Sequence, residues 1–240
     1  MRHTFFNGTG LNDLMMHHNS IDYEVLKKSV KISLCYLLGA PTYMPAVSGR
    51  CVYEIDGYGR IKISCSANIE NDEITFLPRF GFRAIMPKEF NHLEYFGKGP
   101  HDSYVDMQQS SRVGRFRSYV KDQYTHYVKP QDCGNHTDTL WCAVTDQKGN
   151  GLIVKSPKGF DFNCLPYRQE ILASTAHDFE LPESNETVLC FDYMHSGVGS
   201  YSCGPDIQPK YTLNERSFQM EITLQPTTVC KDPLKEVLKA

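Results

Sequence analysis

The chain has 240 residues, 40% of them hydrophobic, which suffices for one sizeable core of an all-β domain. A formal net charge of −3 predicts neither a nucleic-acid surface nor a membrane-surface patch, and no apolar run is long enough to cross a bilayer. Nine irregularly spaced cysteines, together with an N-terminus that has no apolar export segment, predict free thiols and a cytoplasmic location.

The first elements in chain order are an arm and three strands. Residues 1–20 are polar and are expected to form an N-terminal arm, the truncated start of the domain. Apolar residues alternate within 23–38, which favours a strand over a helix. Residues 51–55 and 61–67 flank a glycine-containing turn and predict a hairpin with one wet face and one buried face.

Residues 93–134 show no single helical or strand period. They contain several glycines, prolines and many aromatic residues, and they are expected to form a long, ordered connection between strands. Gly97 and Gly99 within this stretch are expected to form a tight turn, because the rest of a nucleotide-binding fingerprint is missing.

The rest of the sequence predicts mainly strands. They are a second hairpin at 140–154, a buried strand at 188–193, a half-buried strand at 218–224, and short helices at 169–177 and 233–240. Trp141, the one tryptophan, is expected to pack in the core. Short strands separated by turn signals are typical of a β-sandwich.

Three motifs resemble family 2 β-galactosidases. Residues 95–106 (YFGKGPHDSYVD) are similar to their W/Y-F/L-G-x-G-P-x-E-x-Y-x-D segment, and 124–135 (YTHYVKPQDCGN) to Y-x-x-Y-V-x-P-Q-E-N-G-N. Residues 195–205 (HSGVGSYSCGP) resemble H/Q-x-G-x-G followed by S-W/C-G/S-P. The resemblance implies the C-terminal β-sandwich domain of these enzymes, or the small subunit where the enzyme is split.

From this resemblance we expect a large antiparallel β-supersandwich at 21–228, similar to galactose mutarotase, followed by a tail at 229–240. The whole enzyme would hydrolyse terminal β-D-galactosides with retention, and would form a homo-oligomer. Its two catalytic glutamates belong to a TIM-barrel domain or subunit, so no catalytic residue is assigned to this chain and the isolated domain is predicted to be inactive. The resemblance implies Mg and Na for the whole enzyme and no cofactor in this domain.

The resemblance also implies a role for this domain: it buttresses the barrel and completes the rim of the active site, where the galactoside binds. The candidate substrate-binding residues lie in and next to the third motif: His195, Tyr201, Ser202, Cys203 and Gly204. Some family members have, at the position of Cys203, a tryptophan that stacks on the sugar. Cysteine offers a smaller, polarizable surface. A purely structural turn remains the alternative for this loop.

Asp102, Asp106, Asp132 and Asp138 are the carboxylates of the central stretch, and we expect them to cap turns through nearby backbone amides. No close-spaced pair of ligands predicts a metal site.

Two alternative functions remain open. One is a free-standing carbohydrate-binding module. The other is an aldose-epimerase-like mutarotase, which needs a His/Glu acid–base pair, and His195 has no matched glutamate.

Overall fold

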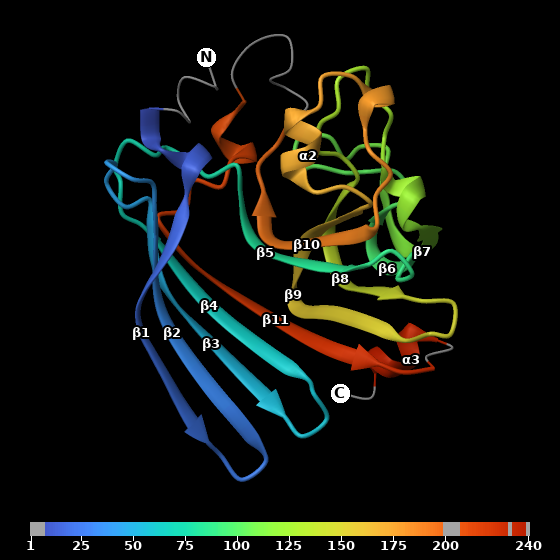
Figure 1. Cartoon of the computed structure of the whole chain (residues 1–240), viewed down its shortest axis with the longest axis horizontal. Coiled ribbons are helices and arrows are strands. Elements are labelled where there is room, and N and C mark those ends of the chain that lie inside the picture. The colour runs from blue at the N-terminus through green and yellow to red at the C-terminus, as the bar shows by residue number, and fades with distance from the viewer. Residues whose placement is uncertain (1–7, 199–206, 230–231, 239–240) are drawn as a thin grey trace. The chain divides into compact units, whose positions relative to one another are not determined.

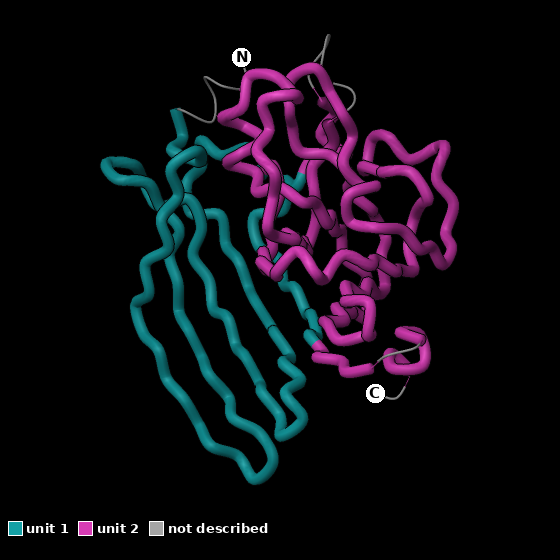
Figure 2. Tube along the Cα trace, turned by 45° about the vertical axis from the view of Figure 1, so that its right-hand side comes forward, with its two compact units in different colours: residues 1–77, 213–224 teal, residues 78–212, 225–240 magenta. Residues whose placement is uncertain are grey.

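A computed structural model of the chain describes residues 8–198, 207–229 and 232–238. Most of its regular structure is β-strand, and the chain forms two compact units, coloured separately in Figure 2. Unit 1 comprises Met1–Leu77 and Leu213–Leu224, and unit 2 comprises Pro78–Thr212 and Gln225–Ala240.

The strands are β1 (Met15–Val25), β2 (Ser29–Gly39), β3 (Val47–Asp56), β4 (Ile61–Ile69), β5 (Arg79–Pro87), β6 (His92–Gly99), β7 (Arg112–Tyr119), β8 (Asn135–Thr145), β9 (Gly151–Leu165), β10 (Glu186–His195) and β11 (Ser217–Thr227). The short helices are η1 (Leu11–Asp13), η2 (Val120–Gln123), α2 (Gln169–Ser174), η3 (Asp178–Glu180), η5 (Pro209–Tyr211) and α3 (Pro233–Val237).

Unit 1 is an antiparallel sheet in the order β1-β2-β3-β4-β11, whose strands run side by side in Figure 1. The predicted hairpin is confirmed as β3 and β4, and the strand predicted within 23–38 is confirmed as β2. Asp56 shapes the β3–β4 turn, because its Oδ1 accepts hydrogen bonds from the backbone N–H groups of Tyr58 and Arg60 at 2.9 and 3.0 Å. The last part of the expected arm is a strand in the structure, because β1 begins at Met15, within residues 1–20.

Unit 2 is antiparallel as well, with successive pairings in the order β5-β10-β9-β8-β6-β7. The second predicted hairpin is confirmed as β8 and β9, and the buried strand as β10. The half-buried strand is confirmed as β11, where exposed and buried residues alternate from Ser217 to Ile222. The predicted helices are confirmed as α2 and α3, both shorter than expected. β5 was not predicted from the sequence.

The expectation of an irregular connection at 93–134 is wrong for much of its length, because β6 and β7 lie within it. The residues of β6 are buried or half-buried on both faces, so the strand shows no polar–apolar alternation. Gly97 and Gly99 are not in a turn but in β6. A Cβ atom at Gly97 would collide with Thr139, and one at Gly99 with Tyr95, so close packing requires glycine at both positions.

Aromatic side chains from this stretch fill part of the core of unit 2. The ring of Tyr95 lies 4.3 Å from that of His136 and 5.2 Å from that of Phe162, measured between centroids. Burial lowers the pKa of His136 to about 4, which keeps the imidazole neutral within this apolar cluster. Trp141 is buried with Ala143 and Ile153, which confirms its predicted core role.

The chain is therefore all-β and antiparallel, as predicted. Within the described ranges, none of the helices has the length and apolar character needed to cross a membrane. The seven cysteines of the described residues are free thiols, and all except Cys35 are buried.

Candidate functional site

The candidate site lies at the C-terminal end of β10, where the third motif begins. His195 is the last residue of this strand and is 8% exposed. Tyr201, Ser202, Cys203 and Gly204 lie outside the described residues, so of the predicted substrate-binding residues the structure places His195 alone.

A half-buried arginine organises the groups around this strand end. Arg79 is the first residue of β5, and its Nε donates a hydrogen bond of 3.1 Å to Asp192 Oδ2 on β10. Its Nη1 donates to Asp132 Oδ2 at 2.6 Å. The side chain of Asn163, on β9, donates to the other oxygen of Asp132 at 2.6 Å. One guanidinium thus joins β5 and β10 to the segment before β8, and Asn163 adds β9.

His195 extends this cluster. Its Nδ1 lies 2.7 Å from the carbonyl oxygen of Ser196, so Nδ1 carries a proton, because a carbonyl oxygen can only accept. Its Nε2 lies 3.7 Å from Asp132 Oδ2. The ring packs edge-on against Tyr104, with centroids 5.2 Å apart. The backbone N–H of His195 donates to Asp161 Oδ2 at 2.9 Å, so both the ring and the backbone of this residue are held.

The first residues after β10 are held just as closely. Ser196 donates its N–H to the carbonyl of Pro78 at 2.9 Å, and Gly197 donates to the carbonyl of Tyr211 at 2.8 Å. Val198 donates its N–H to Asp106 Oδ1 at 3.0 Å. A Cβ atom at Gly197 would collide with the Asp106 carboxylate, so this glycine is required by close approach rather than by backbone conformation.

Burial and charge pull the pKa values of the cluster in opposite directions. Burial raises the pKa of Asp192, and the charge of Arg79 offsets only part of this increase. Burial also raises the pKa of Asp132, but its interaction with the His195 ring and the charge of Arg79 outweigh burial, so the net pKa lies below the usual value. Burial lowers the pKa of Arg79, yet the charges of Asp192 and Asp132 outweigh it and raise the pKa overall, so the guanidinium stays charged.

Asp161 is the exception among the buried carboxylates, because no arginine contacts it among the interactions described. Burial raises its pKa to about 7, and the N–H of His195 opposes this only in part. The group is therefore largely protonated below neutral pH.

These contacts correct the expectation that the central aspartates cap nearby turns. Asp132 bonds to Arg79 and Asn163, and Asp106 accepts from Val198, all of them distant in the sequence. Asp138 instead pairs with Lys98 at 2.5 Å. Asp106, Asp132 and Asp138 thus join distant segments of unit 2.

This arrangement holds segments of unit 2 together through hydrogen bonds and ion pairs. Asp132 and Asp192 are both bound by Arg79, whose N–H groups occupy their oxygens and make them poor nucleophiles or proton donors. Across the described parts of the chain, no three or more His, Cys, Asp or Glu side chains are grouped so that they could hold a metal ion. The cluster is suited to fixing the start of the 196–205 loop.

Sequence reasoning missed Arg79, Asn163, Asp161 and Asp192. Asp192 was recognisable in principle, because a carboxylate inside a buried strand requires a partner. Nothing in the sequence indicated which of the basic residues supplies it.

The fold and the cluster define a class of protein: an antiparallel β-domain in which Arg79 binds both Asp132 and Asp192 at the end of β10. The chain belongs to the Beta galactosidase small chain family, and the sequence model of that family matches residues 6–224.

Relatives support this assignment. The chain is 40% identical to a β-galactosidase of Actinobacillus pleuropneumoniae over 172 residues, which cover 72% of this chain and 16% of that protein. It is 30% identical to one of Staphylococcus xylosus over 207 residues, covering 85% of this chain and 20% of that protein. For a β-galactosidase of Vibrio cholerae the identity is 28%, over 92% of this chain and 21% of that protein. The chain therefore spans only about a sixth to a fifth of the length of these relatives.

Solved structures show weaker likeness. A galactose mutarotase related enzyme of Lactobacillus acidophilus matches with a TM-score of 0.33 and 8% identity, covering 89% of this chain and 73% of that chain. An Aspergillus nidulans amine oxidase matches with a TM-score of 0.32 and 10% identity, covering 93% and 39%. At these scores the galactose-mutarotase-like supersandwich stays a prediction.

Replacing Arg79 by methionine tests the role of the cluster. The substitution leaves the buried carboxylate of Asp192 without its charge partner, and we expect the free energy of unfolding to fall by about 3–5 kcal/mol. The measurement is denaturant unfolding of the Arg79→Met protein. The control is Arg83→Met, whose partner Glu170 is 63% exposed, and which should cost about 1 kcal/mol or less. Equal effects of the two substitutions would contradict the account.

Replacing Asp161 by asparagine tests its raised pKa. Asp161 has a pKa of about 7 in the folded chain and about 3.9 when unfolded, so folding takes up a proton between these values. Its contribution to stability is complete below about pH 4 and is lost as the pH rises through about 7. The stability of Asp161→Asn relative to the wild type should therefore increase from about pH 4 to 7, by up to about 1.4 kcal/mol per pH unit, and level off above about pH 7.

Unfolding titrations at several pH values measure this difference. Asp146→Asn is the control, because the pKa of half-buried Asp146 is lowered by hydrogen bonds in its turn, chiefly with Asn150, and should give no such increase. A pH-independent difference for Asp161→Asn would show that the carboxyl is ionised throughout.

Proposed function

We propose that this chain is the small-chain part of a β-galactosidase, which hydrolyses terminal β-D-galactosides together with a catalytic barrel on the remaining polypeptide. The observation that carries the proposal is the family match over residues 6–224, together with relatives named β-galactosidase. The chain spans a sixth to a fifth of those relatives, which supports a part that acts with a larger one.

In this proposal the chain supplies no catalytic carboxylate. Its cluster carboxylates are bound by Arg79, whereas retaining glycosidases need one free acid and one free nucleophile. The acid and the nucleophile, and the Mg and Na ions, belong to the remaining polypeptide. The whole enzyme is a cytoplasmic homo-oligomer in this proposal.

The 196–205 loop completes the rim of the sugar site in this proposal, with His195, Tyr201, Ser202, Cys203 and Gly204 facing the galactoside. The hydrogen bonds that hold residues 195–198 support this role, because a binding loop works best when its base is held in one position. His195 is fixed by a carbonyl and by Asp132, and no glutamate contacts it among the interactions described, so nothing favours a mutarotase.

A chimera tests the proposed function. In the A. pleuropneumoniae β-galactosidase, this chain replaces the segment that it matches. We expect the chimera to hydrolyse a chromogenic β-galactoside, whereas the isolated chain and the same enzyme with the segment deleted do not. A matching chimera with the S. xylosus segment is the control for tolerance of a foreign segment. If that control is active and the chimera with this chain is folded but inactive, the proposed function is wrong.

Replacing Cys203 by tryptophan tests the loop. An aromatic ring that stacks on the sugar adds on the order of 1 kcal/mol of contact, so we expect a several-fold lower Michaelis constant for lactose-like substrates in the chimera. Turnover need not rise, because tighter ground-state binding does not lower the barrier. Melting temperatures measured on the same samples separate the alternative. A lower melting temperature with an unchanged Michaelis constant would mean that residue 203 lies in a structural turn.

A further inference from the structure

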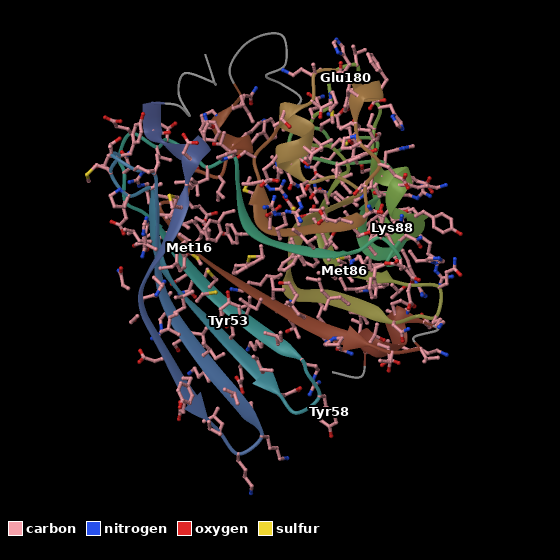
Figure 3. The ribbon with its side chains drawn as sticks, in the orientation of Figure 1. Met16, Tyr53, Tyr58, Met86, Lys88 and Glu180 are labelled. Atoms are coloured by element: carbon pink, nitrogen blue, oxygen red, sulfur yellow. The ribbon has the colours of Figure 1, made fainter. Side chains whose placement is uncertain are left out.

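Unit 1 has one apolar sheet face that is continuous across its strands. Residues directly opposite on neighbouring antiparallel strands share a face, and the registers therefore define rows. Three rows run across β1, β2, β3, β4 and β11: Ile21–Leu34–Cys51–Cys65–Met220, Tyr23–Ile32–Tyr53–Ile63–Ile222 and Val25–Val30–Ile55–Ile61–Leu224. A fourth row is Met16–Leu38–Val47–Ile69. We call this surface the apolar face; Met16 and Tyr53 are labelled in Figure 3.

A β-bulge keeps β1 on this face along its length. The register with β2 shifts between His18 and Ser20, so Met16 before the bulge and Ile21 after it both lie on the apolar face. The neighbouring rows on the opposite face are mostly polar: Asp22–Ser33–Val52–Ser64–Glu221 and Glu24–Lys31–Glu54–Lys62–Thr223. The sheet thus has the pattern of one covered side and one wet side.

The apolar face is covered at one end only. Ile222 on β11 is 1% exposed and Ile63 on β4 is 3% exposed, but Tyr23 in the same row on β1 is 78% exposed. Ile21 and Val25 are 59% and 71% exposed. An apolar row that runs from full burial to nearly full exposure indicates that part of its cover is missing.

The edge of the sheet is open at the same place. Among the described strands, β1 pairs with β2 alone, so half of its backbone N–H and C=O groups face outward. β1 contains no lysine, arginine or proline, the residues that commonly protect an edge strand from pairing.

We propose that the apolar face at β1 and β2 is the docking surface for the remaining polypeptide of the β-galactosidase, which adds a strand to β1 and covers Ile21, Tyr23 and Val25. The inference rests on the proposed function. The relatives carry about four-fifths of their length outside the matched region, so an occupant of sufficient size exists. The surface of that polypeptide facing β1 is apolar and includes an extended segment that pairs with β1.

In the register centred on Tyr23, a second copy of this chain fits the same edge poorly. Antiparallel pairing of two β1 strands centred on Tyr23 places Asp22 of one copy opposite Glu24 of the other. Like charges directly opposite one another destabilise a strand pair.

The chimera provides the test, first without any substitution. Hydrogen exchange should show that the outward-facing amides of β1, those not bonded to β2, exchange more slowly in the intact chimera than in the isolated chain. Equal exchange of these amides in the chimera and in the isolated chain would overturn the proposal. Protection of β1 that disappears on dilution, while the chimera stays active, would assign the edge to a second copy and would also overturn it.

A triple variant tests the side chains. Ile21→Thr, Tyr23→Thr and Val25→Thr keep β-forming residues but remove apolar surface, and should accelerate thermal inactivation of the chimera by about tenfold or more. The matched control on the opposite face is Asp22→Asn with Glu24→Gln, which should change the rate little. Equal rates for the triple variant and the parent would overturn the inference while leaving the proposed function intact. An inactive parent chimera, with an active S. xylosus control, would reject the proposed function instead.

Discussion

The pairing of half-buried Arg79 with carboxylates is the constraint on which the architecture of unit 2 depends. A guanidinium that is largely withdrawn from water requires partners for its charge and its donors, and here Asp192 and Asp132 provide both. Since these partners come from β10 and from the segment before β8, the requirement for pairing fixes where the two meet. Asn163 adds β9 to the same network. The network therefore acts as a geometric anchor for the strand that ends at His195.

The consequence for function is positional. His195 is held through both its backbone and its ring, and the next three residues each donate a backbone hydrogen bond to a distant acceptor. A loop that leaves from such a base begins in a defined direction. In the proposed function, this is the property that a segment at the rim of another domain's active site needs.

Alternation and turn chemistry made the regular strands predictable from the sequence. β3, β4 and β11 have one wet and one buried face, and Asp56 marks a turn by its own hydrogen bonds. β6 was not predicted, because burial on both faces removes the alternation. The part of β1 before Ile21 falls in the predicted arm, since its polar residues and its bulge hide the apolar set that faces one side. The Arg79 cluster joins residues distant in the sequence, and pairing of that kind leaves no local signal.

The central claim is that the Arg79 cluster holds the base of the 196–205 loop. Hydrogen exchange of the backbone amides of His195, Ser196 and Val198 tests it most directly, in the wild type, in Arg79→Met and in Arg83→Met. The account predicts that exchange at these amides, and within β10 next to Asp192, accelerates together in Arg79→Met and is unchanged in Arg83→Met. Exchange at His195–Val198 that stays at the wild-type rate in folded Arg79→Met would contradict it.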